Sequence, residues 1–241
     1  MNPFSLEGQT ALVTGANTGI GQAIAQAMGR AGAHVIAAGR SSCAETVAGI
    51  DSAEELVLDF ADPMAAQDVF SGRRIDILVN NAGIIRRDDS VDLTEKDWDD
   101  VMDVNLKALF FTCQAFGRAA LVRGAGKIVN IASLLSFQGG IRVPSYTASK
   151  HGVAGLTKIL ANEWAAKGIN VNAIAPGYIA TNNTEALQAD QTRNRQILER
   201  IPEGRWGDPA DIGGAAVFLA SSAADYVQGH ILAVDGGWLA R

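Results

Sequence analysis

Short apolar segments alternate with helical stretches from one end of this chain to the other, and this alternation restricts the fold more than any other sequence feature. Each apolar segment has the length of a buried strand and stops at small or polar residues. The predicted strands cover residues 9–14, 34–38, 55–58, 75–79, 127–132, 168–175 and 230–234. Strands separated by helices predict an α/β fold with a doubly wound, parallel, seven-stranded sheet and right-handed crossovers.

Composition narrows the class of protein further. With 241 residues, 48% hydrophobic content and no internal repeat, the chain can bury one core, so we expect a single domain over 1–241. A net charge of −6 without a Lys or Arg run predicts no nucleic-acid or membrane partner. The first residues lack a basic segment followed by an apolar one, so we expect neither export nor membrane spanning, and a cytoplasmic location. Two cysteines and three scattered histidines predict neither a disulfide framework nor a metal site.

Residues that directly follow the predicted strands form the candidate ligand site, because doubly wound sheets bind ligands beyond the carboxyl ends of their strands. Ordinary turn chemistry explains a small or polar residue at any one strand end, but six such ends together favour a ligand site. These residues are Gly15–Gly21, Gly39–Arg40, Asp59–Phe60, Asn80–Gly83, Ser133 and Pro176–Gly177.

The turn after the first strand contains Gly15, Gly19 and Gly21 and opens a helical stretch that reaches about Ala31. Glycines let the backbone turn tightly and approach a ligand, and the N-terminus of the following helix attracts a pyrophosphate. The spacing differs from the commonest dinucleotide fingerprint, G-x-G-x-x-G. The turn therefore indicates either a dinucleotide site or a simple helix cap.

Tyr146 and Lys150 are four residues apart on a predicted helix, so both side chains project from one face. A nearby ammonium favours the phenolate and brings the pKa of a tyrosine, about 10 in water, towards neutral pH. The pair suits acid-base catalysis, although surface neighbours with this spacing are common.

These segments together resemble the short-chain dehydrogenase/reductase family in order and spacing, over nearly the whole chain from about Leu6 to Arg241. The matching residues are 14–21 (TGANTGIG), 80–83 (NNAG), Asn105, Ser133, Tyr146 with Lys150, and Pro176 with Gly177. The resemblance implies a Rossmann-like fold and an NAD(P)-dependent oxidoreductase that acts on CH–OH groups.

The resemblance also implies catalytic roles for four residues. Tyr146 would be the general acid-base at the substrate oxygen, and Lys150 would lower its pKa and bind the nicotinamide ribose. Ser133 would donate a hydrogen bond to the same oxygen. Asn105 would support a water chain that relays the proton from Lys150, with a structural cap or turn as the alternative.

Cofactor contacts are implied along the strand ends. Asn80 and Asn81 would brace the sheet, and the residues expected at the cofactor are Gly15, Asn17, Thr18, Gly19, Ile20, Gly21, Arg40, Asp59, Phe60, Asn81, Ala82, Gly83, Tyr146, Lys150, Pro176, Gly177, Ile179 and Thr181. The second strand ends without an acidic residue for the ribose hydroxyls, and Arg40 suits a 2′-phosphate. Because the similar enzymes are usually described as NAD-dependent, NAD and NADP both stay open. The crossovers between about residues 40 and 74 look short.

Loop residues show a closer resemblance to the sugar-acid dehydrogenases of this family, in segments 81–87, 136–145, 178–184, 204–207 and 234–241. We therefore expect hydride transfer between the cofactor and a secondary alcohol or ketone of a hexonate-type sugar acid. The substrate loops would lie at about 84–90, 134–145 and 178–207. Candidate substrate residues are Arg86, Gln138, Arg142 and Asn183, with Arg87 and Asn182 beside them.

Arg142 is the first choice for the substrate carboxylate, because it lies four residues before Tyr146; a solvated arginine is the alternative. Alternatives for the function are a gluconate 5-dehydrogenase, a 3-oxoacyl-carrier-protein reductase or a non-enzymatic dinucleotide sensor. The resemblance further implies a homotetramer, in which Trp238 would pack at an interface unless it closes the chain's own core.

Overall fold

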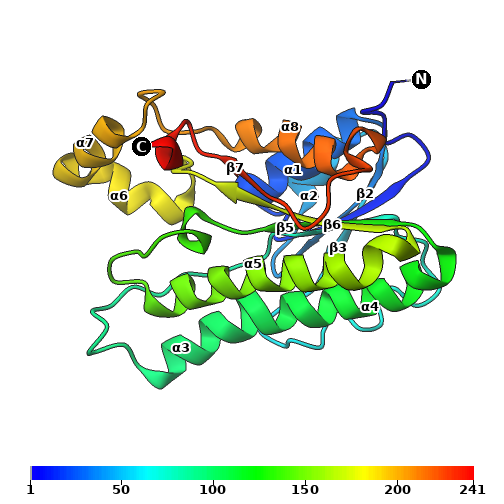
Figure 1. Ribbon diagram of the computed structural model, residues 1–241, viewed down its shortest axis with the longest axis horizontal. Helices are drawn as coiled ribbons and strands as arrows, with labels where there is room; N and C mark the ends of the chain where they lie inside the picture. The colour runs from blue at the N-terminus through cyan, green and yellow to red at the C-terminus, as the bar shows by residue number, and fades with distance from the viewer. Residues whose placement is uncertain (1) are drawn as a thin grey trace.

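The computed structural model describes residues 2–241. They form three layers: a central parallel sheet with helices on both of its faces (Figure 1). The sheet has seven strands in the order β3-β2-β1-β4-β5-β6-β7, which confirms the predicted doubly wound α/β fold. The strands are β1 (Thr10–Thr14), β2 (His34–Gly39), β3 (Ala53–Val57), β4 (Ile77–Asn80), β5 (Gly126–Ile131), β6 (Ile169–Pro176) and β7 (Ile231–Val234). Each predicted strand corresponds to an observed one, with ends that differ by one or two residues at most positions.

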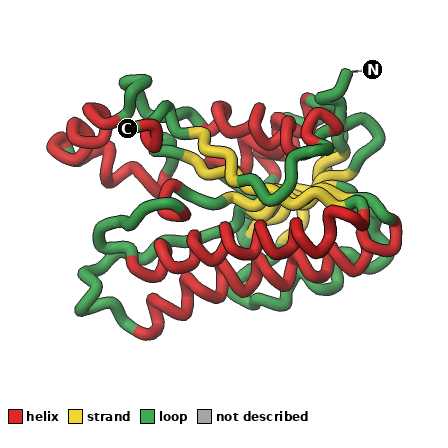
Figure 2. The backbone as a smooth tube through the Cα atoms, in the orientation of Figure 1, coloured by secondary structure: helices red, strands yellow, loops and turns green. Residues whose placement is uncertain are grey.

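Helices cover both faces of this sheet. Figures 1 and 2 show α1 (Gly19–Arg30), α2 (Ala44–Ala48) and α8 (Pro209–Ala220) on one face, and α3 (Glu95–Met102), α4 (Ala108–Arg123) and α5 (Pro144–Trp164) on the other. Two further helices, α6 (Glu185–Ala189) and α7 (Gln191–Arg200), lie beyond the sheet edge next to the C-terminal residues. We call α6 and α7 the lid. No helix within residues 2–241 combines the length and apolarity needed to cross a bilayer.

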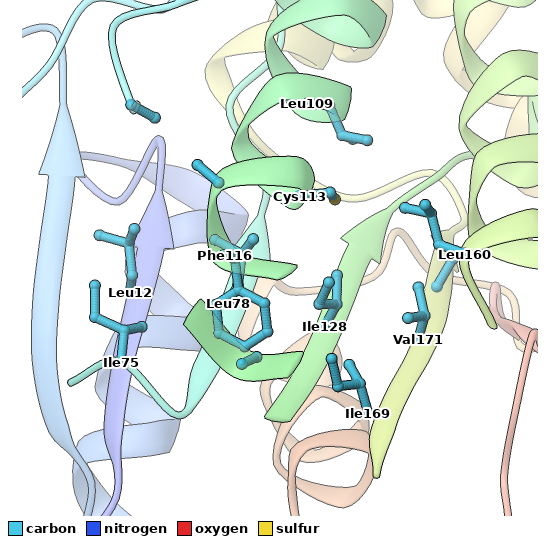
Figure 3. Close-up of a cluster of buried hydrophobic side chains, with 14 of the residues drawn as sticks. Leu12, Ile75, Leu78, Leu109, Cys113, Phe116, Ile128, Leu160, Ile169 and Val171 are labelled. Carbon is cyan, nitrogen blue, oxygen red and sulfur yellow. The ribbon is translucent and has the colours of Figure 1, made fainter. Parts of the chain in front are cut away.

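Alternate side chains of the central strands point to opposite faces of the sheet and build two cores. Leu12, Leu78 and Ile128 contact the α4 side, where they surround Phe116 (Figure 3). Ala11 and Val13 pack on the opposite side against α1 and α8. Because both faces are covered, the strands are apolar nearly throughout, which is the pattern that made them recognisable in the sequence.

Two local features determine the shape of the cofactor side and the catalytic side. The crossovers between residues 40 and 76 are short, as expected: α2 has 5 residues, and only turns connect β3 to β4 in the described chain. A π-helical turn, Asp103–Lys107, joins α3 to α4. Such turns interrupt the regular hydrogen-bond pattern of the helix and occur often at functional sites.

Short 3-10 helices complete the chain at Leu134–Ser136, Ala165–Lys167, Asn182–Thr184, Ser222–Ala224 and Trp238–Ala240.

Candidate active site

Tyr146 and Lys150 lie on the first two turns of α5, which begins at Pro144. Proline suits this first helical position because its φ is already helical and its missing N–H has no partner there anyway. Lys150 Nζ is 5.5 Å from the centre of the Tyr146 ring and donates a hydrogen bond of 2.6 Å to the carbonyl of Ile131. Lys150 is only 5% exposed. The end of β5 therefore fixes the ammonium beside the phenol.

Burial and neighbouring charges shift the pKa values of this pair. Burial disfavours the ammonium and lowers the pKa of Lys150 from 10.5 to about 8. Burial also raises the pKa of Tyr146, against the opposing effects of a hydrogen bond with Ser133 and the positive charge of Arg87. The lower pKa expected from Lys150 is therefore not found in the free protein, because burial outweighs the neighbouring charges. The phenol consequently keeps its proton at neutral pH and is available as an acid, while the lysine titrates close to the working range.

Ser133 follows β5 and caps the 3-10 helix Leu134–Ser136. Its Oγ accepts a hydrogen bond of 3.2 Å from the Leu135 N–H. Because this bond uses a lone pair, the hydroxyl proton stays free to donate, which agrees with the downward effect of Ser133 on the pKa of Tyr146. One substrate oxygen could therefore receive hydrogen bonds from both hydroxyls.

Asn105 lies in the π-helical turn and is 1% exposed. Its Oδ1 accepts from the Ile84 N–H at 2.8 Å, and its Nδ2 donates to the Ile84 carbonyl at 2.9 Å and to Ser149 Oγ at 3.4 Å. The side-chain amide is thereby fully used. It holds the loop after β4 against α5, so the structural alternative describes the side chain of Asn105. The proton relay from Lys150 through water stays a prediction.

The glycine turn after β1 has the form that a phosphate-binding turn needs. Gly15 and Gly19 have φ values of 64° and 58°, a region unfavourable to other residues. A Cβ on Gly21 would lie 2.1 Å from the Gly15 carbonyl oxygen, so only glycine lets α1 approach the turn this closely. Thr18 and Ile20 lie between these glycines, no side chain caps α1, and its first turn contains no acidic residue. Its N–H groups thus suit an anion.

Asn81 braces this turn from the neighbouring strand. Its Nδ2 donates to the carbonyls of Thr14 and Gly15 at 3.0 and 3.1 Å. In return, Thr14 Oγ1 accepts from the N–H groups of Asn81 and Ala82, both at 3.0 Å. A Cβ on Gly83 would lie 3.2 Å from Asn105 Oδ1. These contacts join the cofactor turn to the loop that Asn105 holds.

The end of β2 presents the residues that would distinguish NAD from NADP. Arg40 is exposed and forms no ion pair within residues 2–241. Beside it, Asn17 Nδ2 donates to Ser41 Oγ at 3.1 Å, which connects this loop to the glycine turn. Asp59 is exposed and closes a turn by accepting from the Ala61 N–H, and Phe60 is buried. A free guanidinium and a serine hydroxyl fit a phosphate.

The loop after β6 completes the cofactor side. The Gly177 N–H donates to the Val234 carbonyl at 2.9 Å, so Pro176 leaves the sheet beside β7. Further along, Ile179 is buried and Thr181 Cγ2 lies 3.4 Å from the position that a Cβ on Gly19 would take. This loop therefore lies across the N-terminus of α1. Gly19 and Thr181, which are about 160 positions apart in the sequence, therefore lie next to each other, as a dinucleotide site at the strand ends requires.

The candidate substrate residues differ in whether other side chains already pair with them. Arg142 is ion-paired with Asp88 and Asp89, at 3.7 and 3.1 Å, and is 57% exposed at its side chain. Its backbone φ is 62°, unusual for a residue other than glycine. Two carboxylates already neutralise this guanidinium, so Arg142 holds two loops together and is no longer our first choice for the substrate carboxylate.

Arg87 lies differently from Arg142. Its charge acts on Tyr146, and its guanidinium donates to the Asn183 carbonyl at 2.9 Å, so it bridges the active site and the loop before α6. Arg86 instead pairs with Asp97 and Asp100 of α3. The sequence alone could not show which of these two neighbouring arginines lies near Tyr146.

Trp238 packs inside its own chain. It is 4% exposed and lies against Tyr178, with ring centres 4.7 Å apart. Leu134, Ile197 and Ile201 complete this small core. The interface position predicted for Trp238 is therefore wrong, and the alternative of closing the chain's own core is correct. No local sequence signal could reveal this, because the contacts come from segments far apart in the chain.

Comparisons with known proteins agree with this geometry. A family model described as enoyl-(acyl carrier protein) reductase, of the short-chain alcohol dehydrogenase type, matches residues 15–239. This chain belongs to the short-chain dehydrogenase/reductase family. It is 60% identical to a 2-dehydro-3-deoxy-D-gluconate 5-dehydrogenase of Bacillus subtilis, over 99% of this chain and 97% of that protein. The predicted family and the closer sugar-acid resemblance are confirmed.

Two solved structures share the whole fold. A 2-deoxy-D-gluconate 3-dehydrogenase from Agrobacterium tumefaciens with bound NADP is 71% identical, with a TM-score of 0.99 and full coverage of both chains. A structure described as an NAD(P)-dependent gluconate 5-dehydrogenase from Beutenbergia cavernae, with NADP bound at low occupancy, is 53% identical, with a TM-score of 0.97 and full coverage of both chains. The protein is thus an NAD(P)-dependent oxidoreductase acting on CH–OH groups, and both cofactors are compatible with it.

Proposed function

We propose that this dehydrogenase oxidises the 5-hydroxyl of 2-dehydro-3-deoxy-D-gluconate, or of a closely similar hexonate, and reduces the resulting ketone in the reverse direction. The observation that carries the proposal is the position of Arg87, whose guanidinium donates to the Asn183 carbonyl at 2.9 Å and whose charge acts to lower the pKa of Tyr146, in a protein whose net charge is −6. The lid adds Arg193 and Arg200, whose charges act on Tyr178. A cation whose charge acts on the acid-base tyrosine suits a carboxylate substrate, and the curated relative described above carries this activity in its name.

The chain's own residues supply the proton chemistry in this proposal. A nicotinamide cofactor held by the glycine turn and the loop after β6 would supply or accept the hydride. Tyr146 exchanges the proton of the substrate oxygen, and Ser133 donates a hydrogen bond to that oxygen as charge develops on it. The Lys150 ammonium, 5.5 Å from the centre of the Tyr146 ring, would stabilise the phenolate that forms once Tyr146 has given up its proton. The glycine turn and the loop after β6 hold the dinucleotide.

The substrate test is a panel of purified-protein assays with both cofactors. The panel contains 2-dehydro-3-deoxy-D-gluconate, D-gluconate and a 3-oxoacyl thioester. We expect the highest kcat/KM on the first. Preference for gluconate would favour the gluconate 5-dehydrogenase alternative, and preference for the thioester would favour the carrier-protein reductase alternative. Absence of turnover on all three would contradict the proposal.

Arg87→Ala tests recognition of the carboxylate. Loss of a charged hydrogen bond costs about 1.5–3 kcal/mol, so we expect kcat/KM for the hexonate to fall at least about tenfold. Activity on the C1 carboxamide of the same substrate should change less than threefold. Arg142→Ala is the matched control, because its guanidinium faces Asp88 and Asp89. A selective loss in the Arg142 variant instead would restore the original assignment.

We also propose that NADP is the preferred cofactor and that Arg40 binds its 2′-phosphate. Arg40→Ala should lower kcat/KM for NADPH at least about tenfold and leave the value for NADH within about threefold. Arg30→Ala, an exposed arginine at the end of α1, serves as the control. Equal values for both cofactors before and after the Arg40 substitution would show that Arg40 has no part in the choice.

Finally, we propose a single cytoplasmic domain over residues 1–241, with substrate loops at about 84–90, 134–145 and 178–207, that assembles as a homotetramer. Exposed apolar side chains on α3, α4 and α5 support assembly: Trp98 is 40% exposed, Val122 90% and Ile159 47%. Light scattering at micromolar protein should give four times the chain mass, and a monomeric mass would contradict the assembly.

A further inference from the structure

Gln138 lies close in sequence to the catalytic serine and is held firmly by its backbone. It follows the 3-10 helix that Ser133 caps, and its N–H donates to the Leu134 carbonyl at 3.2 Å. The residue is half-buried. Its backbone position is therefore fixed relative to Ser133, and only the orientation of its side-chain amide decides what it presents.

Two donors determine that orientation. Trp238 Nε1 and a terminal nitrogen of Arg200 both point at Gln138 Oε1, each at 3.3 Å. An indole N–H and a guanidinium can only donate, so the atom that they meet must be the amide oxygen. The other terminal atom of the side-chain amide is then the nitrogen, Nε2. Among residues 2–241 it has no hydrogen-bond partner, so its two N–H groups are left to solvent or to a ligand.

The two donors are themselves fixed. The Arg200 guanidinium carbon lies 4.0 Å from the centre of the Trp238 ring, a cation–π contact that orders both groups. The guanidinium of Arg241 donates to the backbone carbonyls of Arg200 and Glu199 and so ties residues 235–241 to the end of α7. Figure 1 shows the C-terminal residues beside the lid. Lid and C-terminal segment thus form one rigid support for Gln138.

We propose that Trp238 and Arg200 are positioning residues that orient Gln138, and that Gln138 donates a hydrogen bond from its side-chain nitrogen to a hydroxyl or carboxylate oxygen of the substrate. Gln138 thereby selects oxygen-rich substrates over apolar ones, because an apolar group would leave its N–H groups unpaired. The inference rests on the proposed sugar-acid activity. It extends the substrate site to residues 235–241, which lie about 100 positions after Gln138 in the sequence.

The test compares Gln138→Glu, Gln138→Leu and Trp238→Phe with the wild type. A glutamate still accepts from both donors and gains an ion pair with Arg200, but it cannot donate. We expect the Tm of the free Gln138→Glu variant to stay equal or rise, whereas its KM for 2-dehydro-3-deoxy-D-gluconate rises at least threefold with kcat within twofold. Gln138→Leu, which is neutral, should raise KM to a similar extent and lower Tm. Trp238→Phe keeps the packing but loses one N–H, and we expect an intermediate rise in KM.

Arg195→Ala is the matched control, since Arg195 lies on α7, has a side chain 72% exposed and, within residues 2–241, forms its ion pair with Glu199 on the same helix. It should leave KM within 1.5-fold of the wild type. A lower Tm for Gln138→Glu would overturn the orientation, because it would mean that the amide nitrogen has a protein partner. An unchanged KM in both Gln138 variants would overturn the donor role. If the wild type oxidises no sugar acid, the proposed function fails, and the Tm comparison still decides the orientation.

Discussion

Tyr146→Phe is expected to lower kcat at least a hundredfold while the protein still binds NADPH. The substitution removes the hydroxyl that exchanges a proton with the substrate and keeps the aromatic ring beside Lys150, 5.5 Å from its Nζ. Positioned acid-base groups contribute about 10² to 10⁴ in rate, which sets the expected loss. Steady-state kinetics on the hexonate measure kcat, and quenching of protein fluorescence measures cofactor binding.

Tyr226→Phe controls for the loss of a phenol as such, because the Tyr226 side chain is fully exposed. It should behave like the wild type in both assays. Retention of more than about a tenth of wild-type activity by Tyr146→Phe would contradict its role as the acid-base. A large loss of cofactor affinity in the same variant would instead indicate that the hydroxyl holds the dinucleotide.

Lys150→Met is expected to reduce kcat/KM at least about a hundredfold and yet not to destabilise the free protein at pH 7. Activity falls because no ammonium remains to stabilise the Tyr146 phenolate or to bind the ribose. Stability is kept because the buried ammonium is itself unfavourable: its pKa falls from 10.5 to about 8 on folding, equivalent to about 3 kcal/mol. Methionine removes this cost and loses the hydrogen bond to the Ile131 carbonyl, an opposing effect of about 1–3 kcal/mol.

The pH dependence of stability separates this explanation from a general packing effect. The lysine binds its proton more weakly in the folded protein, so between pH 8 and 10.5 the unfolded chain holds more protons than the native one. Unfolding free energy contributed by this group therefore rises with pH across that window and is constant below it. Relative to Lys150→Met, the wild type should gain stability from pH 8 to 10 in urea titrations. A stability difference that does not change with pH would rule out a depressed lysine pKa.

Much of the cofactor side could be predicted from the sequence because its residues act locally. Gly15, Gly19 and Gly21 follow a strand and begin a helix, and backbone geometry alone requires glycine at these positions. Tyr146 and Lys150 share a face because helical periodicity places residues four apart together. Strand ends converge in any parallel sheet, so Ser133 and the loop after β6 had to approach this pair.

The substrate side could not be predicted in the same way, because its contacts join loops that no periodicity relates. Arg142 is close to Tyr146 in the sequence but pairs with Asp88 and Asp89. Arg87, far away in the sequence, is the arginine whose charge acts on the phenol. Two adjacent arginines have different partners: Arg86 pairs with Asp97 of α3, whereas Arg87 donates to the Asn183 carbonyl just before the lid. Loop conformation decides such choices.

Strand and helix periodicity in the sequence indicated the fold class, and the motifs shared with the short-chain dehydrogenase/reductase family indicated the family; both are confirmed. Helical spacing also predicted that Tyr146 and Lys150 share one face of a helix, and both lie on α5. Three-dimensional packing was needed to place Trp238 inside its own chain, to show that the Asn105 amide bonds to the Ile84 backbone, and to orient the amide oxygen of Gln138 towards Trp238. The physical reason is that a side chain's hydrogen-bond partners and surrounding charges come from whichever segments pack against it, and packing joins residues across the whole length of the chain.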